Sequence, residues 1–250
     1  MHRFFIFEPD KIEINRVIIV SNELIHQFCN VLKFHTGEQI LFLDNTGNEY
    51  LCAIENISKK EIIANVIEKR ENRAEPKIKI CLYQAILKNP EKFESVLQKG
   101  VEVGICEFIP LITDRVERES LNKLPRLKKI LKESAEQSGR GIIPILHEPV
   151  TFKNEIAAVR NCAAQFPNKK IVHLLAHTNE KKSLKEIVGN LTQNIEQINI
   201  YIGPEGGFTD KEVLSAKDAG FKIFNLGPRI LRSETAGIIT SSFIIIQNQF

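Results

Sequence analysis

The chain has 250 residues, of which 43% are hydrophobic, so it is long enough for one large domain or two modest ones with a buried core. Its net charge of +3 is too small to indicate a nucleic-acid partner by itself. The five cysteines are odd in number and never spaced as Cys-x-x-Cys, which argues against a disulfide framework and a zinc ribbon.

The first seventy or so residues alternate short β-rich runs with turn signals, which predicts a small β-sheet or barrel. The runs are residues 4–7, 17–20, 39–43, 50–54 and 62–67. Residues 44–48, AspAsnThrGlyAsn, predict a hairpin loop, because these residues tolerate positive φ. Apolar residues at helical spacing predict one helix over 21–33, capped by Ser21. The polar stretch 68–76 is interpreted as a linker.

From Ile78 onward apolar strands alternate with amphipathic helices, which predicts a mainly parallel sheet covered on both faces. Asn89 and Pro90 predict the start of the first helix, and Gly104 predicts its end. Further strands are expected at 108–112, 142–146, 171–176, 198–202 and 221–224, with helices at 125–138 and from 233. In such sheets the ligand lies at the carboxyl ends of the strands.

The segment 198–208 joins a buried strand to a loop with three glycines and a proline. Thr209 and Glu212 form a capping box after it, so the loop is fixed at both ends. Glycines let a backbone approach a ligand closely, but a structural strand-to-helix turn explains these residues equally well. The loop has neither a Walker nor a Rossmann fingerprint.

A second strand-to-helix loop, 226–236, brings Arg229, Arg232 and Glu234 close together in the sequence. Two arginines flanking an apolar pair are unusual at a simple turn. The alternative is that Glu234 complements the dipole of the following helix while the arginines are solvated.

These two loops, GlyProGluGlyGlyPheThr at 203–209 and LeuGlyProArgIleLeuArgSerGluThrAla at 226–236, resemble the RsmE family of ribosomal RNA methyltransferases in the SPOUT superfamily. The likeness covers the whole chain, through residues 2–5, 26–33, 36–38, 84–88, 99–104 and 133–140. Two positions depart from the family pattern. Lys33 replaces the usual arginine and loses its bidentate fork. Gly100 stands where a larger small residue is common, and it should weaken its helix.

The resemblance implies an α/β protein with a PUA-like RNA-binding β-barrel at 1–73 and a SPOUT methyltransferase domain at 74–250. The second domain would contain a parallel sheet, a trefoil knot and a homodimer interface. Sequence physics does not predict a knot, because un-knotted chains are the default. The implied reaction is S-adenosylmethionine-dependent methylation of N3 of a uridine in the 16S RNA of the small ribosomal subunit.

By motif, the implied cofactor pocket comprises Leu175, Ala176, Ile202, Gly203, Pro204, Gly206, Gly207, Leu226, Gly227, Ile230, Leu231, Thr235 and Ala236. Removing the N3 proton of uridine places negative charge on the flanking carbonyl oxygens. Arg229 and Arg232 are candidates to stabilise that charge, or to bind phosphate. Either Glu205 or Glu234 is a candidate general base, although each carboxylate also fits an orienting or capping role.

Positive charge is concentrated in the second part of the chain, since residues 1–73 hold 9 basic and 11 acidic residues and the remainder holds 25 and 20. Residues 123–132 carry five cations and no acid, which indicates either an RNA-binding face or a solvated one. The RNA-binding candidates are Arg126, Lys129 and Arg140, together with Arg3 and Lys33 in the barrel.

The spacing of His173 and His177 falls on an expected strand end, so no metal site is predicted. The sequence shows neither a signal-peptide core nor an apolar run of membrane-spanning length, so a cytoplasmic protein is expected.

Three rival functions remain open: a ribose 2′-O-methyltransferase of the same fold, a non-catalytic ribosome-binding module, and a nucleotide-hydrolysing enzyme. The last lacks a phosphate loop and a pair of Mg²⁺-binding carboxylates.

Overall fold

The computed structural model describes residues 1–165, 170–191 and 195–249. The chain forms two compact units. The N-terminal unit comprises Met1–Glu75 and Lys132–Ile143, and the C-terminal unit comprises Pro76–Leu131 and Pro144–Phe250. Helix α3 (Leu124–Ser138) begins in the C-terminal unit and ends in the N-terminal one.

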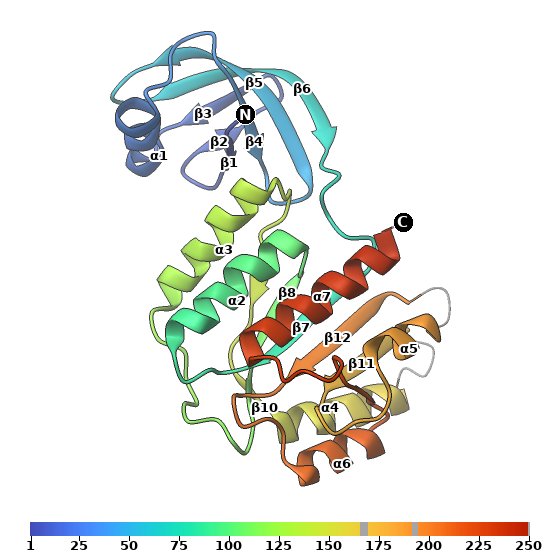
Figure 1. Ribbon diagram of the computed structural model, residues 1–250. Coiled ribbons are helices and arrows are strands. Elements are labelled where there is room, and N and C mark those ends of the chain that lie inside the picture. The colour runs from blue at the N-terminus through green and yellow to red at the C-terminus, as the bar shows by residue number, and fades with distance from the viewer. Residues whose placement is uncertain (166–169, 192–194, 250) are drawn as a thin grey trace. The chain divides into compact units, whose positions relative to one another are not determined.

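The N-terminal unit is built on a six-stranded sheet in the order β1-β4-β5-β6-β3-β2, which curls round its core (Figure 1). Strands β1 and β4 are parallel, and the other neighbours are antiparallel. The strands are β1 (Arg3–Phe5), β2 (Lys11–Ile12), β3 (Arg16–Ile19), β4 (Gln39–Leu43), β5 (Asn48–Ile57) and β6 (Ile62–Glu71). The five predicted runs are confirmed as strands, and the hairpin loop has the expected positive φ at Asn45 and Gly47.

The predicted helix over 21–33 is present as α1 (Asn22–His26) followed by a π-helical turn, η1 (Gln27–Leu32). Ser21 occupies the predicted N-cap position, where its carbonyl accepts from Ile25 N at 3.0 Å, but its side chain makes no capping bond. The Ser21 hydroxyl instead donates to Asp10 Oδ2 at 2.5 Å, while Asp10 Oδ1 accepts from the backbone nitrogens of Val20 and Ser21. Because the Asp10 side chain is buried, its oxygens must accept hydrogen bonds from the protein, and the Ser21 hydroxyl is used for this instead of for the end of the helix.

Interpreting the whole of 68–76 as a linker is wrong for its first half. Strand β6 continues to Glu71, and Arg70 pairs in register with Glu49 of β5, with Arg70 Nε 2.5 Å from Glu49 Oε1. The stretch is polar because its side chains are exposed, although its backbone still completes the ladder. A charged two-stranded extension resembles a linker in sequence.

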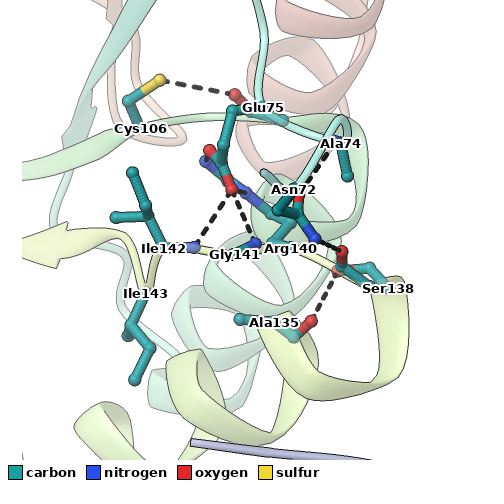
Figure 2. Close-up of polar contacts among 12 residues, drawn as sticks. Asn72, Ala74, Glu75, Cys106, Ala135, Ser138, Arg140, Gly141, Ile142 and Ile143 are labelled. Carbon is teal, nitrogen blue, oxygen red and sulfur yellow. Dashed lines mark hydrogen bonds and ion pairs between the residues drawn. The ribbon is translucent and has the colours of Figure 1, made fainter. Parts of the chain in front are cut away.

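Glu75 anchors the end of this segment to the residues that follow α3 (Figure 2). Its Oε2 accepts from Arg140 Nη2 at 2.6 Å, and its Oε1 accepts from the backbone nitrogens of Gly141 and Ile142 at 3.1 and 3.2 Å. Nearby, Asn72 Nδ2 donates to the Gly139 carbonyl at 2.9 Å. Segment 132–143 is thereby fastened into the N-terminal unit by charge-assisted bonds.

The C-terminal unit contains a parallel sheet in the order β10-β8-β7-β12-β11-β13, with β9 also paired to β8, as the alternation of strands and helices predicts. Its strands are β7 (Lys79–Ala85), β8 (Glu107–Ile112), β9 (Ile145–Leu146), β10 (Val150–Thr151), β11 (Ile171–Ala176), β12 (Gln197–Ile202) and β13 (Lys222–Phe224). The α/β fold class is confirmed.

Helices cover both faces of this sheet (Figure 1). The remaining helices are α2 (Pro90–Val103), α4 (Phe152–Gln165), α5 (Leu184–Gly189), α6 (Asp210–Asp218) and α7 (Ser233–Gln249). Helices α2 and α7 pack together on one face, and α4 and α6 pack on the other. The predicted ends of α2 are confirmed, since Asn89 Oδ1 accepts from Glu91 N and Gly104 has φ 108°.

Gly100 has a packing role that the sequence pattern does not show. A Cβ at this position would lie 2.5 Å from Phe108 Cε1 and 2.9 Å from Ile105 Cδ1, which is closer than real contacts allow. The glycine therefore lets α2 lie directly on β8, and this close approach compensates for the low helix propensity of glycine.

A partly buried chain of polar side chains lies between the sheet and α4. The Tyr201 hydroxyl donates to Glu155 Oε1 at 2.8 Å and lies 3.0 Å from His173 Nδ1. The His173 ring also stacks on Phe221 at a centroid distance of 5.0 Å. Burial lowers the pKa of His173 to about 4, so the ring is neutral in the folded protein near neutral pH.

This burial predicts that acid destabilises the protein through His173. Between pH 6.5 and about 4 the unfolded state binds a proton at this ring that the folded state does not. The free energy of unfolding should therefore fall as pH drops through this window, by at most about 1.4 kcal/mol per pH unit, and should show no such slope above it. Urea unfolding from pH 7.5 to 4.5 measures the slope. His173→Asn should flatten it, whereas the exposed control His35→Asn should not; equal slopes in all three proteins would contradict the prediction.

Candidate active site

A buried hydrogen-bond chain joins three distant segments at the carboxyl edge of the sheet. Gln84 at the end of β7 donates through Nε2 to Ser233 Oγ at 2.8 Å, and Ser233 donates to the Gly203 carbonyl at 2.5 Å. Ser233 begins α7, and Gly203 begins the loop after β12. The chain thus brings the two motif loops together beside β7.

These loops enclose a cavity of about 830 Å³, within the usual range for small-molecule sites. It lies where β11, β12 and β13 end, which is the edge that a parallel sheet predicts for a ligand. Its lining residues are Lys92, Arg115, Ala176, His177, Thr178, Asn179, Ile202, Gly203, Pro204, Glu205, Gly206, Gly207, Phe208, Asp210, Leu226, Gly227, Arg229, Ile230, Leu231, Arg232, Ser233, Glu234 and Ala236.

The structure brings together most of the residues that the sequence singles out. All four catalytic candidates line the cavity, as do all the cofactor candidates except Leu175 and Thr235. Leu175 is fully buried in the core beside the cavity and is the next-to-last residue of strand β11, directly before Ala176. Thr235 lies in the first turn of α7.

The first loop, 203–208, is held from several sides. A Cβ at Gly203 would lie 3.1 Å from the backbone nitrogen of Phe208, so the loop closes tightly on this glycine. Gly207 has a φ of 68°, which is a left-handed backbone conformation that favours glycine. Arg115 Nη1 donates to the Gly206 carbonyl at 2.6 Å, and the Lys88 backbone nitrogen donates to Glu205 Oε1 at 3.3 Å. The predicted Thr209–Glu212 capping box is confirmed.

The second loop, 226–232, carries two arginines with no counter-ion in the structure. Arg229 and Arg232 are exposed, and their guanidinium groups form no hydrogen bond or ion pair with any described residue. Glu234 Oε1 lies 3.4 Å from Lys92 Nζ, while its buried Oε2 has no partner among the residues that the structure describes. Two cations and one free carboxylate oxygen are therefore available to a ligand in the cavity.

The RNA-binding candidates of the N-terminal unit have different environments. Lys33 is exposed and has a left-handed backbone, with φ 54°. Arg3 is half-buried. Its guanidinium carbon lies so near Gly139 that a Cβ added to this glycine would be 3.3 Å from it. Arg140 is 3% exposed, and its guanidinium pairs with Glu75. Its side chain anchors the chain locally, and its contact with RNA stays a prediction.

In the C-terminal unit, Arg126 and Lys129 are exposed on α3. The Arg126 guanidinium makes two parallel bonds to Glu94, from Nε at 2.7 Å and Nη2 at 2.8 Å. This pair holds the pKa of the Glu94 carboxyl below its usual value. Arg126 is thus already neutralised in part by α2.

Two family models match the chain. The one described as RNA methyltransferase domain matches residues 74–245, and the one described as RNA methyltransferase PUA domain matches 20–67. Ribosomal RNA small subunit methyltransferase E of Mesomycoplasma hyopneumoniae is 34% identical over 242 residues, covering 95% of this chain and 96% of the relative. The Bacillus subtilis protein of that name is 30% identical, covering 100% and 98%. The chain belongs to the ribosomal RNA small subunit methyltransferase E family.

Two solved structures share the fold of the whole chain. The Neisseria gonorrhoeae methyltransferase E, bound to S-adenosyl methionine, has a TM-score of 0.82 and 26% identity, covering 99% of this chain and 98% of its own. A methyltransferase of Legionella pneumophila in complex with the same cofactor has a TM-score of 0.78 and 28% identity, covering 98% and 97%. The resemblance predicted from the two loop motifs is confirmed.

Several cavity residues of this family member were not singled out from the sequence as cofactor or catalytic residues, among them Lys92, Arg115, His177 and Phe208. His177 follows directly after β11, so the rule that ligands lie at strand carboxyl ends would have included it. Arg115 follows β8 by the same rule. Lys92 lies within α2, and only the packing of α2 beside α7 brings it to Glu234.

Two absences apply to the described part of the chain. No cluster of three or more His, Cys, Asp or Glu side chains there is placed to hold a metal ion. None of the helices in those ranges combines the length and apolar character that crossing a bilayer requires.

The crowding at Gly203 predicts that Gly203→Ala disrupts the cavity. The added Cβ would lie 3.1 Å from Phe208 N and 3.2 Å from Gly207 C, and backbone atoms can yield only if the loop moves. Affinity for S-adenosylmethionine, measured by calorimetric titration, should fall roughly tenfold or more. Gly189→Ala is the matched control, because a Cβ there meets no atom within 4 Å. Unchanged affinity in Gly203→Ala would show that the loop does not shape the site.

Proposed function

We propose that this chain transfers a methyl group from S-adenosylmethionine to N3 of a uridine in the 16S RNA of the small ribosomal subunit. The observation that carries the proposal is the cavity at the carboxyl edge of the sheet, where both family motifs meet and two arginines have no counter-ion among the described residues. The names of the full-length relatives and the cofactor in the gonococcal structure support the same reaction.

The residues present fit the cofactor. The cavity is large enough for a nucleoside with an amino-acid tail, and Ile202, Leu226 and Ile230 provide apolar surface for a flat ring. Gly207 and Gly227 have positive φ and open space at their Cβ positions, so the backbone itself can approach the ligand. When bound, the cofactor supplies a methyl group on a sulfonium. The protein aligns that group with the acceptor and excludes water.

The two arginines can stabilise the negative charge that forms when the acceptor nitrogen loses its proton. Uridine N3 carries a proton at neutral pH, and its anion places charge on the two flanking carbonyl oxygens. Arg229 and Arg232 are exposed, unpaired within the described chain, and at the rim of the cavity. Guanidinium groups aimed at those oxygens stabilise the anion as an oxyanion hole does.

Of the two candidate bases, we assign Glu234 to the proton of N3. Its Oε2 is buried and without a partner in the described residues, so it is available to accept a proton, while Lys92 holds its Oε1. Glu205 is exposed and accepts a hydrogen bond from the Lys88 backbone nitrogen, which suits a role in orienting the 203–208 loop.

We further propose that residues 1–73 bind RNA as a PUA-like domain and that residues 74–250 form the catalytic domain. The matches of the two family models support this division. Arg3 and Lys33 would contribute contacts on the first domain, and Arg126, Lys129 and Arg140 on the α3 side. Ribosomal RNA as substrate places the reaction in the cytoplasm.

We also propose a homodimer and a trefoil knot in the catalytic domain. Exposed isoleucines at 230, 239 and 246, in the second loop and along α7, support a self-association surface beside the cavity. In support of the knot, β13 pairs with β11 at the sheet edge, and Asn225 bonds to Lys182 and Leu184. From there the chain returns to pack α7 against β7 and β12.

The test of the reaction is the identity of the methylated product. Small ribosomal subunits from a bacterial strain that lacks its own family enzyme are incubated with the protein and labelled cofactor, and the RNA is digested to nucleosides. N3-methyluridine is the expected product. A ribose-methylated nucleoside would establish the 2′-O reaction instead, and tight subunit binding without label transfer would establish the non-catalytic module.

The arginines should affect catalysis more than cofactor binding. Arg229→Ala and Arg232→Ala are each expected to lower kcat by about 10²–10³, the effect of losing one donor to a developing oxyanion. Affinity for S-adenosylmethionine should change little in the same titration. A cofactor affinity that falls in parallel with kcat would assign the arginines to the cofactor.

The two carboxylates should differ in the pH dependence of the reaction. Glu234→Gln should abolish the acidic limb of the pH–rate profile, and Glu205→Gln should retain it.

A further inference from the structure

A second cavity, of about 470 Å³, lies in the C-terminal unit beside the active site. Its floor is apolar, made by the buried residues Ile86, Leu87, Phe93 and Leu127. Its rim is polar, with Asn89 at the start of α2 and Ser120 and Asn122 in the loop before α3. An apolar floor with amide groups around it suits a flat ring that carries hydrogen-bonding edges.

The charge of this cavity is positive, and two of its cations have no ion pair among the described residues. Three cations line it, Arg118, Lys123 and Arg126, together with two carboxylates, Glu91 and Glu94. Arg126 and Glu94 pair with each other through two hydrogen bonds. Arg118 is a half-buried residue, and no ion pair or hydrogen bond joins its guanidinium to any residue in the described ranges. A half-buried charge without a counter-ion is costly unless an anion binds to it.

Two separate segments line both this cavity and the active site. In α2, Glu91 lines the second cavity and Lys92 lines the first. In the loop after β8, Arg118 lines the second cavity and Arg115 the first, so at most about 10 Å of chain separates them. Lys88 contacts neighbours of both cavities: its backbone nitrogen donates to Glu205, which lines the first, and its Nζ lies 2.9 Å from Oε2 of Glu117, which precedes Arg118 in the chain.

We infer that this second cavity is a subsite for a nucleotide of the RNA chain that neighbours the methylated one, with its base on the apolar floor and its phosphate on Arg118. The inference rests on the proposed function and adds to it the place where the flanking strand is recognised. Sequence-specific proteins read single-stranded RNA by splaying out bases onto apolar or guanidinium surfaces and bonding their edges. The cavity supplies each of these elements within reach of the active site.

The test compares Arg118→Ala with Arg160→Ala, which removes the same charge from an exposed arginine on α4 whose Nη2 donates to the Ser215 carbonyl. The probe is the same small ribosomal subunits, assayed for methyl transfer and for binding at several salt concentrations. Arg118→Ala should raise KM for the subunits roughly tenfold, as expected for a lost charge-assisted bond, with kcat and cofactor affinity nearly unchanged. The slope of log K against log salt should decrease by about 0.7, the value for one phosphate contact on a single strand.

A second variant, Asn122→Trp, fills the cavity from its rim without removing charge. It should raise KM as Arg118→Ala does but leave the salt slope intact. An active wild type with KM and salt slope unchanged in Arg118→Ala would overturn the subsite. If the wild type binds subunits but transfers no methyl group, the proposed function fails, and the salt slope of Arg118→Ala still decides the subsite. Loss of cofactor affinity in both variants would assign their effect to the fold and overturn the inference.

Discussion

The bond from Ser233 to the Gly203 carbonyl, completed by Gln84, is the constraint on which the candidate active site depends. It joins β7, the loop after β12 and the start of α7, three segments that are far apart in the sequence, and its two side chains are buried. Removing one member would leave buried polar atoms without partners, which costs more than the bond contributes. Gly237 preserves the geometry, because a Cβ there would lie 2.8 Å from Gln84 Oε1. The cavity therefore depends on the packing of α7 against β7, because this packing holds Ser233 between Gln84 and Gly203.

The arginines of this protein separate into two groups. Arg70 and Arg140 pair with carboxylates that fix the N-terminal unit, and Arg126 pairs across α2 and α3. Arg229 and Arg232 have no such partner within the described chain, and they surround the space where negative charge is expected. The ion pairs stabilise the fold, whereas an unpaired arginine can bind RNA or a developing anion without first giving up a partner. Composition alone cannot separate the groups, since partners are chosen by tertiary contacts.

Much of the architecture could be predicted from the sequence, because periodicity and turn chemistry are local. The strands, the parallel sheet, the Asn89 cap and the Thr209–Glu212 box follow from short patterns. Local patterns did not predict the contacts that a distant side chain decides. For example, the Ser21 hydroxyl donates to Asp10 and not to the end of the helix. The loop motifs likewise identified most of the cavity, but Lys92 reaches it only through helix packing. The packing role of Gly100 was also invisible, because Phe108 is what makes a glycine necessary there.

The fastening of residues 132–143 to the N-terminal unit has a consequence for biosynthesis. A ribosome releases the chain in order, so the six strands emerge well before the arginine that Glu75 binds. Until residue 143 has left the exit tunnel, that carboxylate and Asn72 have no native partners on this side. The first unit to be synthesised thus finishes folding only after residues 76–131 of the other unit have been made. The order of translation and the order of structural completion differ in this protein.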